Sequence, residues 1–220
     1  MTITLLPTLA ALGAAFVQPT SPEQFRRYFV GQWTVNKMIN YKAGGISGRF
    51  EGVAAFKELH LVANPGNPGG DHQHRPTLLV YNESGSFAPK ESSFGASRET
   101  RNKLLYDFGM AQRGEVAVFY PDIVDATAGD SFDGHSAEEI LESSRFLYFL
   151  KASQSPGTLS IESHAENHET YDGSIEVEAA NAFISTWRVK GDQQDGEIVT
   201  LYRRKDTEGN VIDVEARDEL

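Results

Sequence analysis

The stretch GQWTVNKMINY, residues 31–41, decides the predicted fold. It opens with a glycine and continues as a strand in which Trp33 and Val35 alternate with polar residues. Alternation with a period of two is typical of a strand with one buried face. Just before it, Ser21-Pro22-Glu23-Gln24 combines an N-cap serine, a proline at the first helical position and a capping-box glutamine. We therefore expect a short helix that leads directly into the first strand.

Further segments of strand character follow along the chain, separated by turn residues such as Gly85 and Asp172-Gly173. The predicted strands are residues 32–41, 48–59, 76–83, 94–108, 115–121, 144–151, 158–171, 181–190 and 197–204. A second capping box at 136–141 predicts one or two helical turns inside a long connection. So many strands with so little helix predict an all-β protein, either a barrel or a sandwich.

Composition bounds the organisation and the partners. A chain of 220 residues with 40% hydrophobic residues is long enough for one sizeable core, and we place a single domain at residues 21–205. The net charge of −11 repels phosphate backbones and anionic lipids, which disfavours nucleic-acid and membrane partners. The chain has no cysteine, so disulfides and thiolate chemistry are excluded. Composition does not define the oligomeric state.

The two ends suggest a possible address. Residues 3–17 form an apolar run of signal-peptide length within segment 1–20, although no Lys or Arg precedes it. The acidic tail, residues 206–220, ends in Arg-Asp-Glu-Leu, which is similar to a retrieval signal of the endoplasmic reticulum. Together the ends favour the lumen of that compartment. The alternative is a cytoplasmic protein whose N-terminal run packs on the barrel.

A series of short motifs resembles, in chain order, a calycin-like family of small proteins catalogued as a domain of unknown function. The motifs are Gly31-Gln32-Trp33, the Gly48–Phe56 strand, Tyr81–Gly85, His164 with Tyr171, Trp187–Gly191 and Tyr202-Arg203-Arg204. The resemblance covers residues 29–204. It implies a single antiparallel, up-and-down, lipocalin-like barrel with a small-molecule cavity, and it implies no particular reaction.

The same resemblance implies how the barrel closes. In calycins a tryptophan of the first strand lies at the barrel floor and is crossed by an arginine of the last strand. Here Gly31 and Trp33 would close the barrel with Arg203 or Arg204, a planar cation over an indole face. This role is architectural.

Segment 158–171 carries the residues with most chemical potential. On a straight strand His164, Glu166 and His168 share one face. That face either points outward as an ordinary solvated side, or a bulge turns it into the cavity, where burial would tune the groups for acid–base work. His164 and His168 lie roughly 13 Å apart along a strand, so they cannot share one metal ion, and we predict no metal site.

The leading hypothesis is a small-molecule-binding barrel with no cofactor. The predicted ligand contacts are Tyr81, Phe119, Phe149, His164, His168, Tyr171, Trp187 and Arg188. The alternative is an enzyme in which His164 acts with Glu166 or Glu169 as a general acid–base pair. A lesser alternative is haem binding through a single histidine. No P-loop, dinucleotide fingerprint or nucleophile elbow occurs, so whether the protein is an enzyme stays open.

Overall fold

The structure is a computed structural model. It describes residues 16–59, 77–91, 95–122, 132, 137–166, 169–206 and 208–212, of which 137 and 162–166 are described by their backbone alone. The apolar N-terminal run up to residue 15 and the Arg-Asp-Glu-Leu end lie outside the described residues. Within the described part, no helix is long and apolar enough to span a bilayer.

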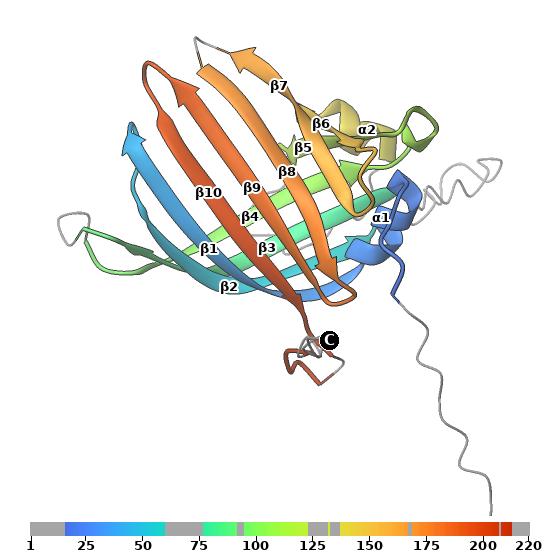
Figure 1. The fold of residues 1–220 in the computed structure, drawn as a ribbon, viewed down its shortest axis with the longest axis horizontal. Helices are drawn as coiled ribbons and strands as arrows, with labels where there is room; N and C mark the ends of the chain where they lie inside the picture. The colour runs from blue at the N-terminus through green and yellow to red at the C-terminus, as the bar shows by residue number, and fades with distance from the viewer. Residues whose placement is uncertain are drawn as a thin grey trace, which may run out of the picture.

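The architecture is a closed antiparallel barrel in up-and-down order, as predicted, but it has ten strands and not the nine predicted (Figure 1). Each strand pairs with its neighbours in sequence, and β1 closes the ring by pairing with both β2 and β10. The strands are β1 (Gly31–Ala43), β2 (Gly48–Glu58), β3 (Leu78–Pro89), β4 (Arg98–Asp107), β5 (Glu115–Pro121), β6 (Ser144–Ala152), β7 (Thr158–Glu166), β8 (Glu169–Ala179), β9 (Ala182–Gly191) and β10 (Asp195–Arg204).

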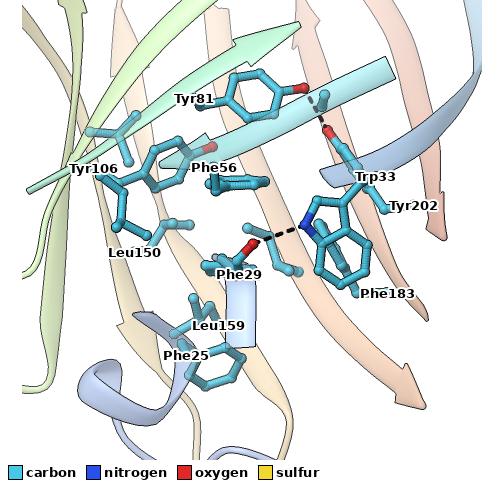
Figure 2. Packing of buried hydrophobic residues seen from close by; sticks show 14 of the residues in the cluster. Phe25, Phe29, Trp33, Phe56, Tyr81, Tyr106, Leu150, Leu159, Phe183 and Tyr202 are labelled. Carbon is cyan, nitrogen blue, oxygen red and sulfur yellow. Dashed lines mark hydrogen bonds between the residues drawn. The ribbon is translucent and has the colours of Figure 1, made fainter. Parts of the chain in front are cut away.

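The helix α1 (Pro22–Phe29) closes one end of the barrel (Figure 1). The Ser21 hydroxyl accepts a hydrogen bond from the Gln24 amide, so the predicted N-cap is confirmed. Phe25 and Phe29, four residues apart, are fully buried in the main core. The Trp33 indole N–H donates to the Phe29 carbonyl at 2.9 Å, which ties the end of the helix to the first strand (Figure 2).

Arg204 completes this floor. Its guanidinium carbon lies 4.3 Å from the centroid of the Trp33 ring, and its nitrogens donate to the carbonyls of Val30 and Tyr28. Burial lowers the pKa of Arg204, and the nearby Tyr28 partly opposes that shift. The neighbouring Arg203 is exposed. Of the two arginines, Arg204 is therefore the one that crosses the tryptophan.

A second, smaller core lies on the outside of the barrel wall. Outward-facing Leu78 and Val80 of β3 and Leu105 of β4 are buried there against Phe132 and Ile140. Ile140 belongs to α2 (Ala137–Glu142), the helix expected within the long connection. Phe132 and α2 therefore cover part of the wall around β3 and β4.

Two glycines that the sequence suggests as turns lie inside strands instead. Gly85 pairs with Gly52 in the middle of β3 and β2. Gly173 lies inside β8, so the predicted strand 158–171 is wrong: β7 ends at Glu166 and β8 begins at Glu169. A Cβ added to Gly173 would lie 2.6 Å from the Thr186 carbonyl oxygen. Close packing, and not a turn, requires a glycine there.

Candidate functional site

A buried ion pair lies inside the barrel. The ammonium nitrogen of Lys37 on β1 is 2.6 Å from Oε1 of Glu83 on β3, across the intervening strand β2. The Glu83 side chain is 4% exposed and that of Lys37 is 19% exposed. Moving two charges out of water costs several kcal/mol per ion, so a pair in this position is a weak way to stabilise a fold. We therefore treat the pair as the centre of the candidate site.

Paired glycines make room for these charges. A Cβ on Gly52 or Gly85 would come within 2.8 Å or 2.7 Å, respectively, of the Phe50 ring. The ring thus lies against the two glycines, close to the wall. The Lys37 nitrogen lies 4.9 Å from the centroid of the Phe50 ring, in cation–π contact. Because the Phe50 ring lies flat against the barrel wall, the lysine side chain can pass over it and reach Glu83 across β2.

Two tyrosines extend the polar cluster. The Tyr81 hydroxyl donates to the second carboxylate oxygen of Glu83 and lies 3.1 Å from the Tyr202 hydroxyl (Figure 2). A phenol has a single hydrogen, and Tyr81 gives its own to Glu83, so Tyr202 must donate to Tyr81. Burial raises the pKa of both tyrosines well above the ordinary value, and Glu83 adds to the effect. Both phenols therefore stay neutral at physiological pH.

Tyr106 on β4 and Tyr148 on β6 place a second pair of neighbouring phenols in the interior. Burial raises the pKa of each of them as well. The Tyr148 ring lies 4.6 Å from that of Trp187 on β9, edge to face, which brings the indole into the same space. Aromatic faces with few polar groups are typical of small-molecule sites.

The interior is accessible from the end opposite α1. Along β1 the inward residues Trp33 and Val35 are buried, whereas Ile39 and Tyr41, farther from the helix, are half-buried. On β9 the inward Trp187 is also half-buried, although Val189 beyond it is buried. Solvent therefore reaches the inner wall above the Lys37–Glu83 pair.

A pocket of about 630 Å³ lies at the rim of this open end. It is lined by Asn40, Tyr41, Lys42, Ser47, Lys90, Asp172, Arg188, Val189, Lys190, Asp195, Gly196 and Glu197. Arg188 is ion-paired with Glu197 at 2.7 Å and with Asp172 at 3.8 Å. The Arg188 side chain is 59% exposed. It lines the pocket at the rim and does not lie beside Lys37.

The predicted ligand contacts fall in three places. Tyr81 lies in the polar cluster, and Trp187 packs against the interior core. Phe119 and Phe149 instead contact Phe146, which is 46% exposed, and Phe119 also packs on the outer core. An irregular register between β5 and β6 at Val118/Phe119 accompanies this arrangement.

The acid–base candidates lie near the open end. The Tyr171 hydroxyl donates to the carboxylate of Glu169, which is 6% exposed. The backbone of His164 is paired opposite Tyr171, beyond an irregularity in the β7–β8 register. The side chains of His164 and Glu166, and all of His168, lie outside the described residues. The described residues contain no cluster of three or more acidic or histidine side chains that could hold a metal ion.

Lys37 and Glu83 were not among the sequence candidates, although a signal for both exists. Lys37 follows Trp33 and Val35 in the inward phase of β1, and Glu83 follows Tyr81 in that of β3. A charged residue in the apolar phase of an alternating strand marks a group that must be paired inside. Their partnership across β2 depends on the register, which the sequence alone does not provide.

Fold and interior together define a closed antiparallel barrel with a polar cluster in its lumen. Residues 29–204 match the Family of unknown function (DUF6314), and the chain belongs to that family. No curated protein matches the sequence.

Solved structures with similar barrels include the S-type phycobiliprotein lyase CPES from Guillardia theta (7% identity, 85% of this chain and 94% of that one, TM-score 0.49). Rv2717c from M. tuberculosis is similar at 8% identity, 84% and 98% coverage and a TM-score of 0.45. A de novo designed fluorescence-activating β-barrel is similar at 11% identity, 82% and 96% coverage and a TM-score of 0.30. At these identities and scores we transfer no ligand or activity from these proteins.

Proposed function

We propose that this protein binds a small, partly apolar molecule inside its barrel, in the half that lies toward the open end, opposite α1. The observation that carries the proposal is the Lys37–Glu83 pair with its phenol neighbours, buried below a half-exposed inner wall. A purely structural interior has no need of a charged pair whose desolvation is costly. A ligand-binding interior uses such groups to orient a polar end.

The proposed site has an apolar wall and a polar base. Ile39, Leu104, Tyr148 and Trp187 pack on the interior core while keeping part of their surface exposed, and they would contact the apolar body of the ligand. Lys37 would orient its polar end. Ligand would enter past Tyr41 and the rim pocket, which has the size of ordinary small-molecule sites.

The test fills the lumen from one strand. Ile39 points inward on β1 and its neighbour Met38, 46% exposed, points outward. Titration with the neutral fluorophore N-phenyl-1-naphthylamine should give saturable binding to the parent protein. Ile39→Trp should abolish this binding, whereas Met38→Trp on the same strand should retain it. Absence of saturable binding, or equal binding by both variants, would contradict the proposal.

Acid–base catalysis at Glu169 is a second candidate function, favoured by the hydrogen bond that this buried carboxylate accepts from Tyr171. Native mass spectrometry of protein from its own source would reveal a retained molecule. That molecule is returned to the emptied protein, and its conversion is followed by mass. Conversion of the molecule by the parent protein but not by Glu169→Gln would support an enzyme. If the mass of the molecule stays unchanged with both the parent protein and the variant, the protein is a binder alone.

A further inference from the structure

The Lys37–Glu83 pair leaves hydrogen-bonding capacity inside the lumen. An ammonium group has three N–H donors, and in the part of the chain that the structure describes one of those of Lys37 goes to Glu83. The Phe50 ring lies against the same nitrogen and accepts no conventional hydrogen bond. Glu83 receives Lys37 on one oxygen and Tyr81 on the other. The cluster can therefore give hydrogen bonds through Lys37, while its carboxylate already has a donor on each oxygen.

The charges of the pair cancel, which decides what kind of polar group fits beside it. A carboxylate ligand would gain Lys37 but would be repelled by Glu83, whose oxygen is 2.6 Å from the same nitrogen. A cationic ligand would compete with Lys37 for Glu83 and would be repelled by the positive charge of Lys37. A neutral hydrogen-bond acceptor, such as a carbonyl oxygen, accepts from Lys37 without either penalty.

We infer that Glu83 is a specificity-determining residue: by neutralising Lys37 it makes the lumen select neutral ligands with a terminal carbonyl over the corresponding carboxylates. This inference rests on the proposed function and adds the ligand class to it. The carboxylate acts by repulsion, since rejecting a competitor is as effective for specificity as improving the preferred contact. Tyr81 holds the carboxylate in place by donating to the oxygen that does not contact Lys37.

The test uses four dansyl probes with the same undecyl chain and different ends: methyl, primary amide, carboxylate and ammonium. Binding is followed by dansyl fluorescence at pH 7.5. In the parent protein the amide should bind about tenfold more tightly than each of the other three, the effect of one hydrogen bond to a charged group.

Glu83→Gln then leaves Lys37 without its counter-charge. The carboxylate probe should gain about a hundredfold in affinity, which exceeds the tenfold preference for the amide, and become the preferred ligand. Glu51→Gln is the matched control, because Glu51 is an exposed residue of β2 and should leave the order of affinities unchanged. The Lys37→Met/Glu83→Gln double variant buries no charge and keeps the test valid if the single variant does not fold. It should lose the amide preference over the methyl probe.

The outcomes separate the two levels of the proposal. Saturable binding of all probes with the carboxylate equal to or tighter than the amide would overturn the inference and keep the binding function. Unchanged affinities in Glu83→Gln and in the double variant would overturn it as well. Failure of every probe to bind the parent protein would overturn the proposed function itself. A gain in affinity for the carboxylate probe that occurs only in Glu83→Gln would support both the binding function and the inference about Glu83.

Discussion

The guanidinium of Arg204 stacks on the indole of Trp33, with 4.3 Å between the guanidinium carbon and the ring centroid. The first and last strands of the barrel meet at this contact, since Trp33 pairs with Arg204 in the β1–β10 register. The same guanidinium donates to the carbonyls of Val30 and Tyr28, where α1 passes into β1. One side chain therefore joins the helix, the first strand and the last.

Replacement of Arg204 by lysine should destabilise the fold although the charge is kept. A lysine cannot stack its planar group on Trp33 or serve both carbonyls in the same geometry. We expect the free energy of unfolding to fall by about 2 kcal/mol, measured by urea denaturation. Arg203→Lys, at the exposed neighbouring position, should change it by no more than about 0.5 kcal/mol. Equal effects of the two variants would argue against the role of Arg204.

Gly31→Ala should perturb the same corner from the other side. Gly31 has a φ of +137°, and a Cβ there would lie 2.6 Å from a guanidinium nitrogen of Arg204. Gly95 also has a positive φ, +94°, but a Cβ there would meet nothing within 4 Å. Both alanine variants carry backbone strain of about 1–3 kcal/mol, but only the new methyl group of Gly31→Ala collides with Arg204. Denaturation should therefore show a clearly larger loss of stability for Gly31→Ala than for Gly95→Ala. A loss no greater than that of Gly95→Ala would disprove the collision.

Stability should fall in alkaline solution. Burial raises the pKa of Tyr28, Tyr81, Tyr106, Tyr148 and Tyr202 above the ordinary value of about 10. Below pH 10 both folded and unfolded chains keep these protons, so the stability is fully present. Above pH 10 only the unfolded chain releases them, and each group lowers the free energy of unfolding by about 1.4 kcal/mol per pH unit until its folded pKa is reached.

Denaturation between pH 8 and pH 11.5 measures this slope, and absorbance at 295 nm follows tyrosinate formation. Tyr202→Phe should reduce the slope above pH 10 by about one group's contribution. Tyr120→Phe, at a position that is 42% exposed, should leave it nearly unchanged. An identical slope in the parent protein and in Tyr202→Phe would show that Tyr202 does not contribute.

The sequence predicts the barrel better than its interior. The Gly-x-Trp strand, the Ser21 cap and the alternating segments depend on local patterns, and these features are present in the structure. Glycines are ambiguous, because a turn and a close contact both require one. The phase of β1 and β3 could have singled out Lys37 and Glu83, but their meeting across Phe50 and the glycines of β2 and β3 depends on packing between strands.

Gly173 provides a direct check of that ambiguity. At a turn with negative φ an alanine would be tolerated, whereas inside β8 its Cβ would lie 2.6 Å from the Thr186 oxygen and 2.9 Å from Cδ1 of Ile161. We expect Gly173→Ala to lower the free energy of unfolding by about 1–3 kcal/mol, the usual cost of overpacking. Thermal and chemical denaturation give this value, and an unchanged stability would contradict the strand packing.

The closure of β1 on β10 also determines when folding can finish. These strands are adjacent in space but come from opposite ends of the barrel sequence, so their pairing is highly non-local. Non-local pairing is slow, and a chain leaving the ribosome exposes two unpaired strand edges until β10 has been made. All of the barrel sequence through β10 must therefore be synthesised before the floor of Trp33 and Arg204 can form, and until then both strand edges are open to edge-to-edge aggregation.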